Sequence, residues 1–259
     1  MDNGSTHFAD VTLLITHFNR SKSLERLLKK LEEARCSFGG IVVSDDCSTT
    51  THLEHVETLS QRYGFRLIRA SQNRGLGNNM NKGQDAVVTP YTLYVQEDFL
   101  PLENFVVRLA DGLSLLEEHI SFDMVRFYAY ECYPHLQYYK AGFSKMLFRW
   151  WYPGLGKFAF YSDHPHLRRS SFLNKFGRYL EGTSGDKTEF SMMIRFLKKQ
   201  GKAFFFNEYK SVFEQVNSSL EPSTMRRNIW RNSNNLMIRI IRVAYRYLNY
   251  YSALYVRNF

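Results

Sequence analysis

The sequence has few cysteines and no long hydrophobic run. Cys36, Cys47 and Cys132 form no CxxC pair, and an odd number gives no obvious disulfide framework, so we expect a reduced, cytosolic protein. The residues before Val11 are polar and contain no apolar signal-peptide stretch. Nowhere does the chain approach the roughly 18 consecutive apolar residues that span a bilayer, so any membrane contact is expected to be peripheral.

Acidic residues are the minority among the charges. The 34 Lys and Arg exceed the 25 Asp and Glu, which gives a net charge of +9. A basic surface favours anionic partners such as nucleotides, phospholipid headgroups or nucleic acid, but it does not choose among them. With 259 residues, 44% of them hydrophobic, the chain can bury the core of one large α/β domain, which argues against disorder.

Strands and helices alternate in the first half. Short apolar runs predict buried strands at 11–16, 41–44, 65–68 and 91–95. Apolar residues at helical spacing predict helices around 24–31, 52–62 and 104–118, with a short helix at the end of 73–83. We expect Gly39 and Gly40 to end the first helical unit. This alternation predicts a mostly parallel sheet with right-handed crossovers.

The second half is less regular. We expect a strand at 123–130, loops and a hairpin at 131–165, a helix at 187–200 and a strand at 203–206. From Met225 to the end, the pattern is helical and basic.

Polar residues follow three of the predicted strands. They are Thr16 to Arg20, Asp45-Asp46 and Gln96-Glu97-Asp98. An Asp after a strand is also a common turn residue and helix cap, so each cluster alone is a weak signal. Because ligands of open parallel sheets bind at the carboxyl ends of strands, the three clusters together predict one shared cleft.

The same residues resemble family 2 glycosyltransferases of the GT-A fold. The resemblance covers roughly residues 10–205. Four motifs of the family are matched in order by Thr16-x-Phe18-Asn19-Arg20, Asp45-Asp46-x-Ser48, Asn73-x-Gly75 and Asn81-x-Gly83. Gln96-Glu97-Asp98 stands at the position of the metal-binding Asp-x-Asp motif. It implies an α/β, Rossmann-like, mostly parallel sheet flanked by helices. We expect a GT-A domain at 1–220, with a nucleotide-binding half (1–100) and an acceptor half (101–220), and an amphipathic basic helical extension at 221–259.

The resemblance also implies roles for single residues. Those expected to line the nucleotide pocket are Thr16, Phe18, Asn19, Arg20, Gln96 and Glu97. Asp45 would accept a hydrogen bond from the base, and Asp46 would lie near the base or ribose. Arg74 and Asn81 would face the nucleotide or its phosphates. Asp98 would bind Mg²⁺ or Mn²⁺, which neutralises the charge of a leaving nucleoside diphosphate.

Two departures from the family pattern concern this metal. Gln96 stands where the first Asp of Asp-x-Asp is usual. Many relatives carry a late His that helps to hold the metal, whereas residues 211–218 contain none. Glu214 or Gln215 would be the substitutes.

The general base is expected at the start of the 187–200 helix. By resemblance, Glu189 would take the proton from the acceptor hydroxyl in an inverting reaction, and Asp186 is the second candidate. The alternative is structural, because Asp186 and Glu189 have the spacing of a helix capping box.

Two aromatic or imidazole clusters have open interpretations. His164-Pro165-His166 is more typical of a loop or an acceptor-side surface than of a metal site. Trp150, Trp151 and Tyr152 are suited either to stacking on sugar rings or to the core.

The C-terminal tail combines arginines with apolar residues on different helical faces. Arg239, Arg242 and Arg246 share one face. This is typical of an interfacial helix on anionic lipid. The alternative is a helix packed on the catalytic domain with its arginines in water.

These features predict a metal-assisted hexosyltransferase. It would move a sugar from a nucleotide-sugar donor, UDP-linked by resemblance, to a hydroxyl of a glycan or lipid-linked saccharide in cell-surface polysaccharide biosynthesis. We expect it in the cytoplasm, peripheral to the inner face of the plasma membrane. The alternative is a non-catalytic nucleotide- or carbohydrate-binding protein of the same fold. No nucleic-acid partner is expected, because no binding motif is recognisable.

Overall fold

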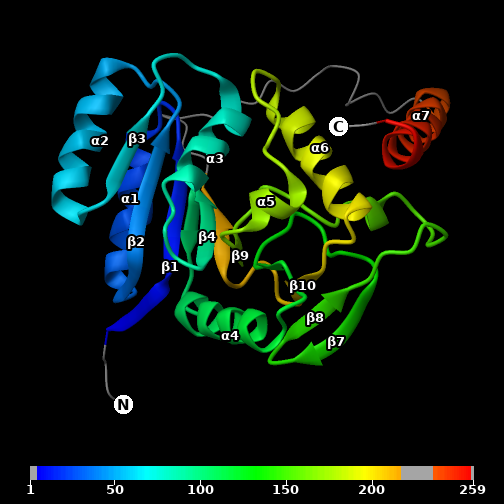
Figure 1. Ribbon diagram of the computed structural model, residues 1–259, viewed down its shortest axis with the longest axis horizontal. Helices are drawn as coiled ribbons and strands as arrows, with labels where there is room; N and C mark the ends of the chain where they lie inside the picture. The colour runs from blue at the N-terminus through cyan, green and yellow to red at the C-terminus, as the bar shows by residue number, and fades with distance from the viewer. Residues whose placement is uncertain (1–4, 217–235, 258–259) are drawn as a thin grey trace.

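A central sheet organises the protein in the computed structural model, which describes residues 5–216 and 236–257 (Figure 1). Within these residues one sheet has nine strands in the order β3-β2-β1-β4-β9-β6-β10-β8-β7. In that order the strands are Arg66–Arg69, Cys36–Asp45, Thr6–His17, Tyr91–Gln96, His166–Arg169, Met124–Arg126, Ala203–Phe206, Phe143–Met146 and Leu136–Lys140. The strands β1 to β4 are mutually parallel, which confirms the predicted α/β class and crossovers.

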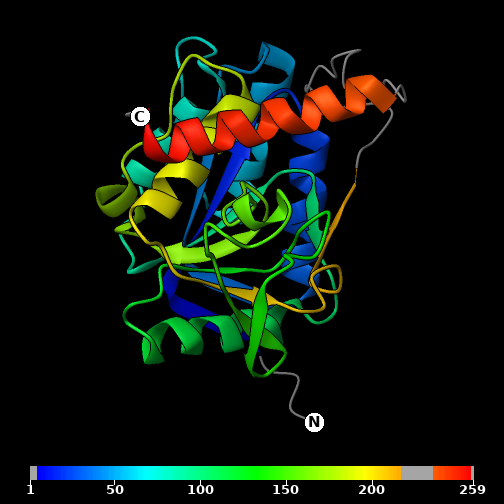
Figure 2. The ribbon, with the colours of Figure 1, turned by 90° about the vertical axis from the view of Figure 1, so that its right-hand side faces the viewer.

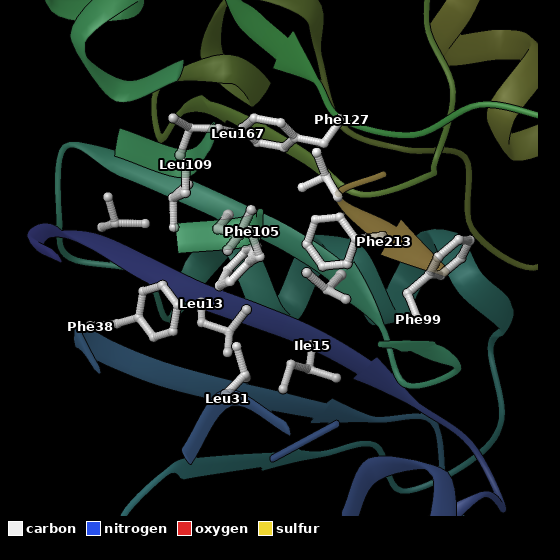
Figure 3. Packing of buried hydrophobic residues seen from close by; sticks show 14 of the residues in the cluster. Leu13, Ile15, Leu31, Phe38, Phe99, Phe105, Leu109, Phe127, Leu167 and Phe213 are labelled. Carbon is white, nitrogen blue, oxygen red and sulfur yellow. The ribbon is translucent and has the colours of Figure 1, made fainter. Parts of the chain in front are cut away.

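Helices cover both faces of the sheet. On one face lie α1 (Ser21–Glu33), α2 (Thr50–Tyr63) and α4 (Phe105–Glu118); on the other lie α3 (Gly75–Asp85), α5 (Phe172–Phe176) and α6 (Gly185–Lys198). Successive strand side chains point to opposite faces, so Leu13 and Ile15 join the first core and Leu14 joins the second. Figure 3 shows the first core, in which Leu31 of α1 and Phe105 of α4 pack against Leu13 and Ile15.

The glycines Gly39 and Gly40 do not end a unit, as expected from the sequence, but lie inside β2. A Cβ atom on Gly39 would lie 1.9 Å from the carbonyl oxygen of Ala9. The register between β1 and β2 shifts at this point, between Phe8 and Thr12. Gly39 is therefore required for the close approach of the two backbones at a bulge, not for a turn.

The second half contains strands that the sequence did not indicate. Instead of a strand over 123–130, β6 covers only Met124–Arg126, and β9 runs antiparallel between β4 and β6. The hairpin expected in 131–165 is β7–β8, followed by the short 3-10 helix η1 (Gly156–Phe158). A separate two-stranded sheet pairs β5 (Phe99–Pro101) with β11 (Phe213–Gln215).

The C-terminal helix α7 (Leu236–Tyr255) lies against α6, across one side of the molecule (Figure 2). The predicted helical tail is thus present from Leu236, and its part at 225–235 lies outside the described residues. No helix in the described ranges is long and apolar enough to cross a membrane. All three cysteines are free.

Candidate active site

The three predicted polar clusters lie at one edge of the sheet. In the register of the sheet, Thr16 of β1 is opposite both Ser44 of β2 and Gln96 of β4. The loops that follow these strands therefore start side by side. The site is built from the carboxyl ends of β1, β2 and β4, where a parallel sheet binds its ligands.

Asp45 is fully enclosed at this edge. Its Oδ1 lies 2.7 Å from Nδ1 of His17 and 2.5 Å from the hydroxyl of Ser48, and its Oδ2 accepts the Ser48 amide at 2.9 Å. Burial would raise the pKa of Asp45, but these hydrogen bonds lower it overall, so the carboxylate is charged. Asp45 joins the loops after β1 and β2 through these three hydrogen bonds.

Asp46 holds the start of α3. Its carboxylate accepts the backbone amides of Arg74 at 2.9 Å and Gly75 at 2.8 Å. The first amides of a helix have no partner within the helix, so Asp46 satisfies two of them. The backbone of Arg74 is thereby anchored to the loop after β2, and its side chain is exposed.

Asn81, further along α3, faces the acceptor half. Its amide nitrogen donates to the carbonyl of Tyr179 at 3.0 Å and to Glu181 Oε1 at 2.8 Å, and its oxygen accepts the Tyr179 amide. The side chain is buried, and both its amide nitrogen and its oxygen are hydrogen-bonded to this segment. Asn81 therefore positions residues 179–181 in this structure.

Lys82 lies beneath the acidic pair. Its Nζ donates to the Ser44 hydroxyl at 2.6 Å, to the Asp45 carbonyl at 2.8 Å and to Asn79 Oδ1. Burial lowers the pKa of Lys82 to about 8, although Asp46 and Asp45 oppose this shift. A half-buried amine thus lies close to the carboxylates at the strand ends.

Asp98 lies at the end of β4 among polar partners. Its Oδ2 is 3.1 Å from Nη1 of Arg20 and accepts Nε2 of Gln215 at 2.9 Å; the same Arg20 atom is 3.5 Å from Glu97. The pairing of β11 with β5 brings Gln215 to this position. Asp98 Oδ1 is buried and accepts no hydrogen bond from any described residue.

This arrangement fits a metal bound through a single carboxylate. A buried, unpartnered carboxylate oxygen is a ligand that a hard cation would satisfy. Among the described residues no three His, Cys, Asp or Glu side chains gather as a metal cage. Gln96 does not add to the ligands, because its Nε2 points to the carbonyl of Asp163 at 3.3 Å. Any Mg²⁺ or Mn²⁺ would take its other ligands from a bound diphosphate and water.

Glu189 of α6 lies next to Asp163. Its Oε1 accepts the Asp163 amide at 3.3 Å, and burial raises the pKa of Glu189. The N-cap of α6 is Ser184, two residues before Asp186, so the predicted capping box of Asp186 and Glu189 is wrong. Glu189 is bonded across the site instead, whereas Asp186 lies in the exposed first turn.

Both the fold and the order of these motifs match a known family. The model of glycosyl transferase family 2 matches residues 12–177, which is more than half of the chain. The chain belongs to this family. The match spans β1 to β9 and includes every strand end that forms the site described above.

Solved structures share the fold of this glycosyltransferase. S. aureus TarS 1-349 in complex with UDP-GlcNAc has a TM-score of 0.57 and 16% identity over 95% of this chain and 70% of that chain. Mannosyltransferase PcManGT from Pyrobaculum calidifontis, in complex with GDP-Man and Mn²⁺, has a TM-score of 0.56 and 14% identity over 97% and 73% of the two chains. No curated protein matches in sequence.

Two sequence interpretations of residues 150–166 are wrong in part. His164 lies in the loop before β9, as expected, and is half-buried, whereas His166 is fully buried in β9 and does not lie on a surface; burial lowers the pKa of both imidazoles, that of His164 to about 3. Trp150 and Trp151 are not core residues, since 57% and 60% of their surfaces are exposed.

Sequence reasoning missed several residues of this glycosyltransferase that support the site. The missed residues are His17, Lys82, Arg126, Tyr161, Asp163 and Arg168. The strongest example is Asp163, whose carboxylate accepts the Tyr161 hydroxyl at 2.7 Å while burial and the charge of Glu189 raise its pKa to about 8. An Asp followed by His and Pro in an aromatic segment resembles an exposed turn, so no local signal indicated it.

Proposed function

We propose that this glycosyltransferase moves a hexose from a UDP-linked donor to a hydroxyl of a glycan or a lipid-linked saccharide in cell-surface polysaccharide synthesis, with inversion at the anomeric carbon. The supporting observation is a hydrogen-bonded bridge across the site. Gln96, at the donor side, donates to the carbonyl of Asp163, and the amide of Asp163 donates to Glu189. The end of β4 and the candidate base Glu189 are thus connected through the backbone of Asp163. In-line attack requires that the donor and the base have such defined relative positions.

In the proposed reaction, the acceptor oxygen attacks the anomeric carbon while the bond from that carbon to the diphosphate breaks. Glu189 takes the proton of the attacking hydroxyl, and Asp186 is the second candidate for this role. A Mg²⁺ or Mn²⁺ bound by Asp98 would neutralise the diphosphate that leaves. Arg20 pairs with the Asp98 and Glu97 carboxylates and holds them in place.

The remaining assignments concern the nucleotide. Those proposed to contact it are Thr16, Phe18, Asn19, Arg20, Asp45, Asp46, Arg74, Asn81, Gln96 and Glu97. The UDP-GlcNAc in the TarS structure supports a uridine donor, and the GDP-Man and Mn²⁺ in the mannosyltransferase support a metal-assisted nucleotide site. A cytoplasmic location at the inner face of the plasma membrane completes the proposal, with membrane contact through 225–259.

Calorimetric titration with UDP, GDP and dTDP, each with and without Mn²⁺, tests this proposal. We expect UDP to bind more tightly with Mn²⁺, and we expect Asp98→Asn to abolish the enhancement and to lower turnover about 100- to 1,000-fold. Asp111→Asn is the matched control, because Asp111 pairs with Arg108 at the surface. An equal Mn²⁺ effect in Asp98→Asn would contradict the metal assignment.

A non-catalytic protein of the same fold is the competing proposal, favoured by Gln96 in place of the first metal-binding Asp. It predicts nucleotide binding that neither Mg²⁺ nor Mn²⁺ strengthens and no hydrolysis of any nucleotide sugar. No binding of any nucleotide would contradict the transferase proposal and favour a non-catalytic, carbohydrate-binding protein.

A further inference from the structure

The outward side of helix α7 is apolar, although the helix already packs on the domain by its other side. On the packed side, Ala253 and Leu254 are buried, and the ring of Tyr250 lies 4.6 Å from that of Phe158. The described apolar residues of the helix that are exposed are Ile241 (63% exposed), Val243 (47%), Tyr245 (66%), Leu248 (72%) and Tyr255 (63%). Steps of four, three and seven residues place Ile241, Tyr245, Leu248 and Tyr255 on one outward stripe, and Val243 lies off this stripe.

A second exposed apolar element lies beside this helix, in the loop that carries Trp150 and Trp151. Lys157 is buried, and its Nζ donates to the Trp150 carbonyl at 2.6 Å and to the Tyr251 hydroxyl at 2.9 Å. The Tyr251 hydroxyl in turn donates to the Trp150 carbonyl at 2.8 Å. The tryptophan loop and α7 are therefore tied together through backbone and buried groups, and the two indole rings remain exposed.

The charged residues within these two segments all have one sign. Neither 147–157 nor 236–257 contains an Asp or Glu, and their basic residues are Arg149, Lys157, Arg239, Arg242, Arg246 and Arg257. A second copy of the chain on this surface would bring arginines against arginines, which is unfavourable. Exposed Trp and Tyr flanked by Arg are typical of the headgroup region of a bilayer, where the rings are half-immersed and the cations meet anionic lipid.

We propose that the outward stripe of α7 and the Trp150–Trp151 loop form one surface that lies on an anionic lipid bilayer. This assigns both tryptophans to the membrane and not to sugar rings. Binding of this surface to lipid is a property separate from glycosyl transfer. It rests on the proposed function in one respect: a lipid-linked acceptor would lie in the same membrane.

Vesicle flotation of the full-length protein tests the surface. The protein is expected to float with vesicles of phosphatidylcholine and phosphatidylglycerol, and to float less with phosphatidylcholine alone or with added salt. Tyr245→Gln with Leu248→Gln, and separately Trp150→Ser with Trp151→Ser, should each lower the partition coefficient about tenfold. Val88→Gln with Ile120→Gln is the control, because these side chains are 89% and 82% exposed elsewhere and should not affect flotation.

Tryptophan fluorescence gives a readout that a folding defect cannot imitate. The chain has three tryptophans, so Trp230→Phe leaves only Trp150 and Trp151 as reporters. Their emission should shift to the blue and be quenched by bromolipids on anionic vesicles. Three results would each overturn the proposal. They are unquenched emission, equal flotation of the variants and the wild type, and a dimer in light scattering that the α7 variant abolishes.

These assays need no nucleotide, so they separate the surface from the transferase assignment. The surface variants should bind UDP as the wild type does in vesicle-free buffer. Flotation without any nucleotide binding would leave the surface standing and remove the proposed function; nucleotide binding without flotation would overturn the surface and the proposed membrane contact and leave the proposed glycosyl transfer standing.

Discussion

Replacing Asp163 by Asn should flatten the pH dependence of stability. Burial and the charge of Glu189 raise the pKa of Asp163 to about 8, from a value near 4 in an unfolded chain. Between these two pH values the folded protein keeps a proton that the unfolded chain releases. The contribution of Asp163 to stability is therefore fully present below pH 4 and is lost as the pH rises toward 8.

The loss amounts to about 1.4 kcal/mol per pH unit, or about 3 kcal/mol between pH 5 and pH 7. The groups that face this carboxyl are the hydroxyl of Tyr161, the guanidinium of Arg168 and the carboxyl of Glu189. An Asn amide has the shape of the protonated acid and can still accept the Tyr161 hydroxyl. Asp163→Asn should thus remove the proton uptake and leave the hydrogen bond in place.

Urea unfolding of both proteins at pH 5, 6, 7 and 8 measures this effect. The difference in unfolding free energy, Asp163→Asn minus wild type, should rise with pH by about 1.4 kcal/mol per unit. Glu189→Gln serves as the comparison, because it removes the neighbouring carboxylate and keeps Asp163 titratable. Parallel curves for Asp163→Asn and the wild type, with a flat curve for Glu189→Gln, would show that Glu189 and not Asp163 holds the proton.

Further predictions concern the base, Lys82 and the close contact of β1 with β2. Glu189→Gln should lower kcat about 100- to 10,000-fold with little change in donor KM, whereas Asp186→Asn should change kcat only a few-fold. Steady-state kinetics with saturating acceptor measure both values. A lower kcat for Asp186→Asn than for Glu189→Gln would make Asp186 the base. The unfolding free energy of the wild type, relative to Lys82→Met, should rise between about pH 8 and 10.5, because the folded-state pKa of Lys82 is lowered. The rise should be below about 1.4 kcal/mol per pH unit, because the amine is partly solvated. A decrease of the unfolding free energy over this pH range, measured by urea titration, would contradict the prediction. Gly39→Ala should lower the unfolding free energy by at least about 3 kcal/mol, because the new Cβ would collide with the Ala9 carbonyl. Gly40→Ala, whose Cβ would lie 3.4 Å from the nearest atom, should lower it by about 1 kcal/mol or less. Equal melting temperatures of the two variants would contradict the close contact at the bulge.

The donor half was predictable because its signals are local. The leucines of α1 recur at helical spacing and are buried, and the apolar run of β1 is a buried parallel strand, as expected. Polar residues that directly follow such strands must lie at one edge of a parallel sheet, whatever their role. Thus topology alone placed Asp45 and Asp98 near each other.

The helix expected at 187–200 and the strand expected at 203–206 are confirmed as α6 and β10, but the strand β9 was not predictable, because its side chains are mostly polar and yet buried. The strand β9 reads His-Leu-Arg-Arg, yet Arg168 is fully buried and donates to the Tyr179 hydroxyl at 2.5 Å and to Gln84 Oε1 at 2.8 Å. A charged residue is buried only when such partners are supplied. Gln84 is 84 residues away in sequence, so no window of the sequence contains the information that makes β9 a central strand.

Similarly, the sequence left Glu214 and Gln215 open as substitutes for the late His. The three-residue strand β11 brings Gln215 into contact with Asp98. Pairing of Gln215 with Phe99 puts its amide on Asp98, while Glu214 is exposed on the same strand.

The pairing of β11 with β5 also bears on how the protein is made. Gln215 reaches Asp98 across 117 residues of chain, so the partner of the candidate metal ligand is among the last parts of the domain to leave the ribosome. Domains synthesised from the N-terminus fold progressively, and the first four strands can associate long before β11 exists. A nascent chain would therefore hold a formed nucleotide half while its Asp98 still lacks Gln215. The contact of Gln215 with Asp98 therefore forms only after β11 has been synthesised.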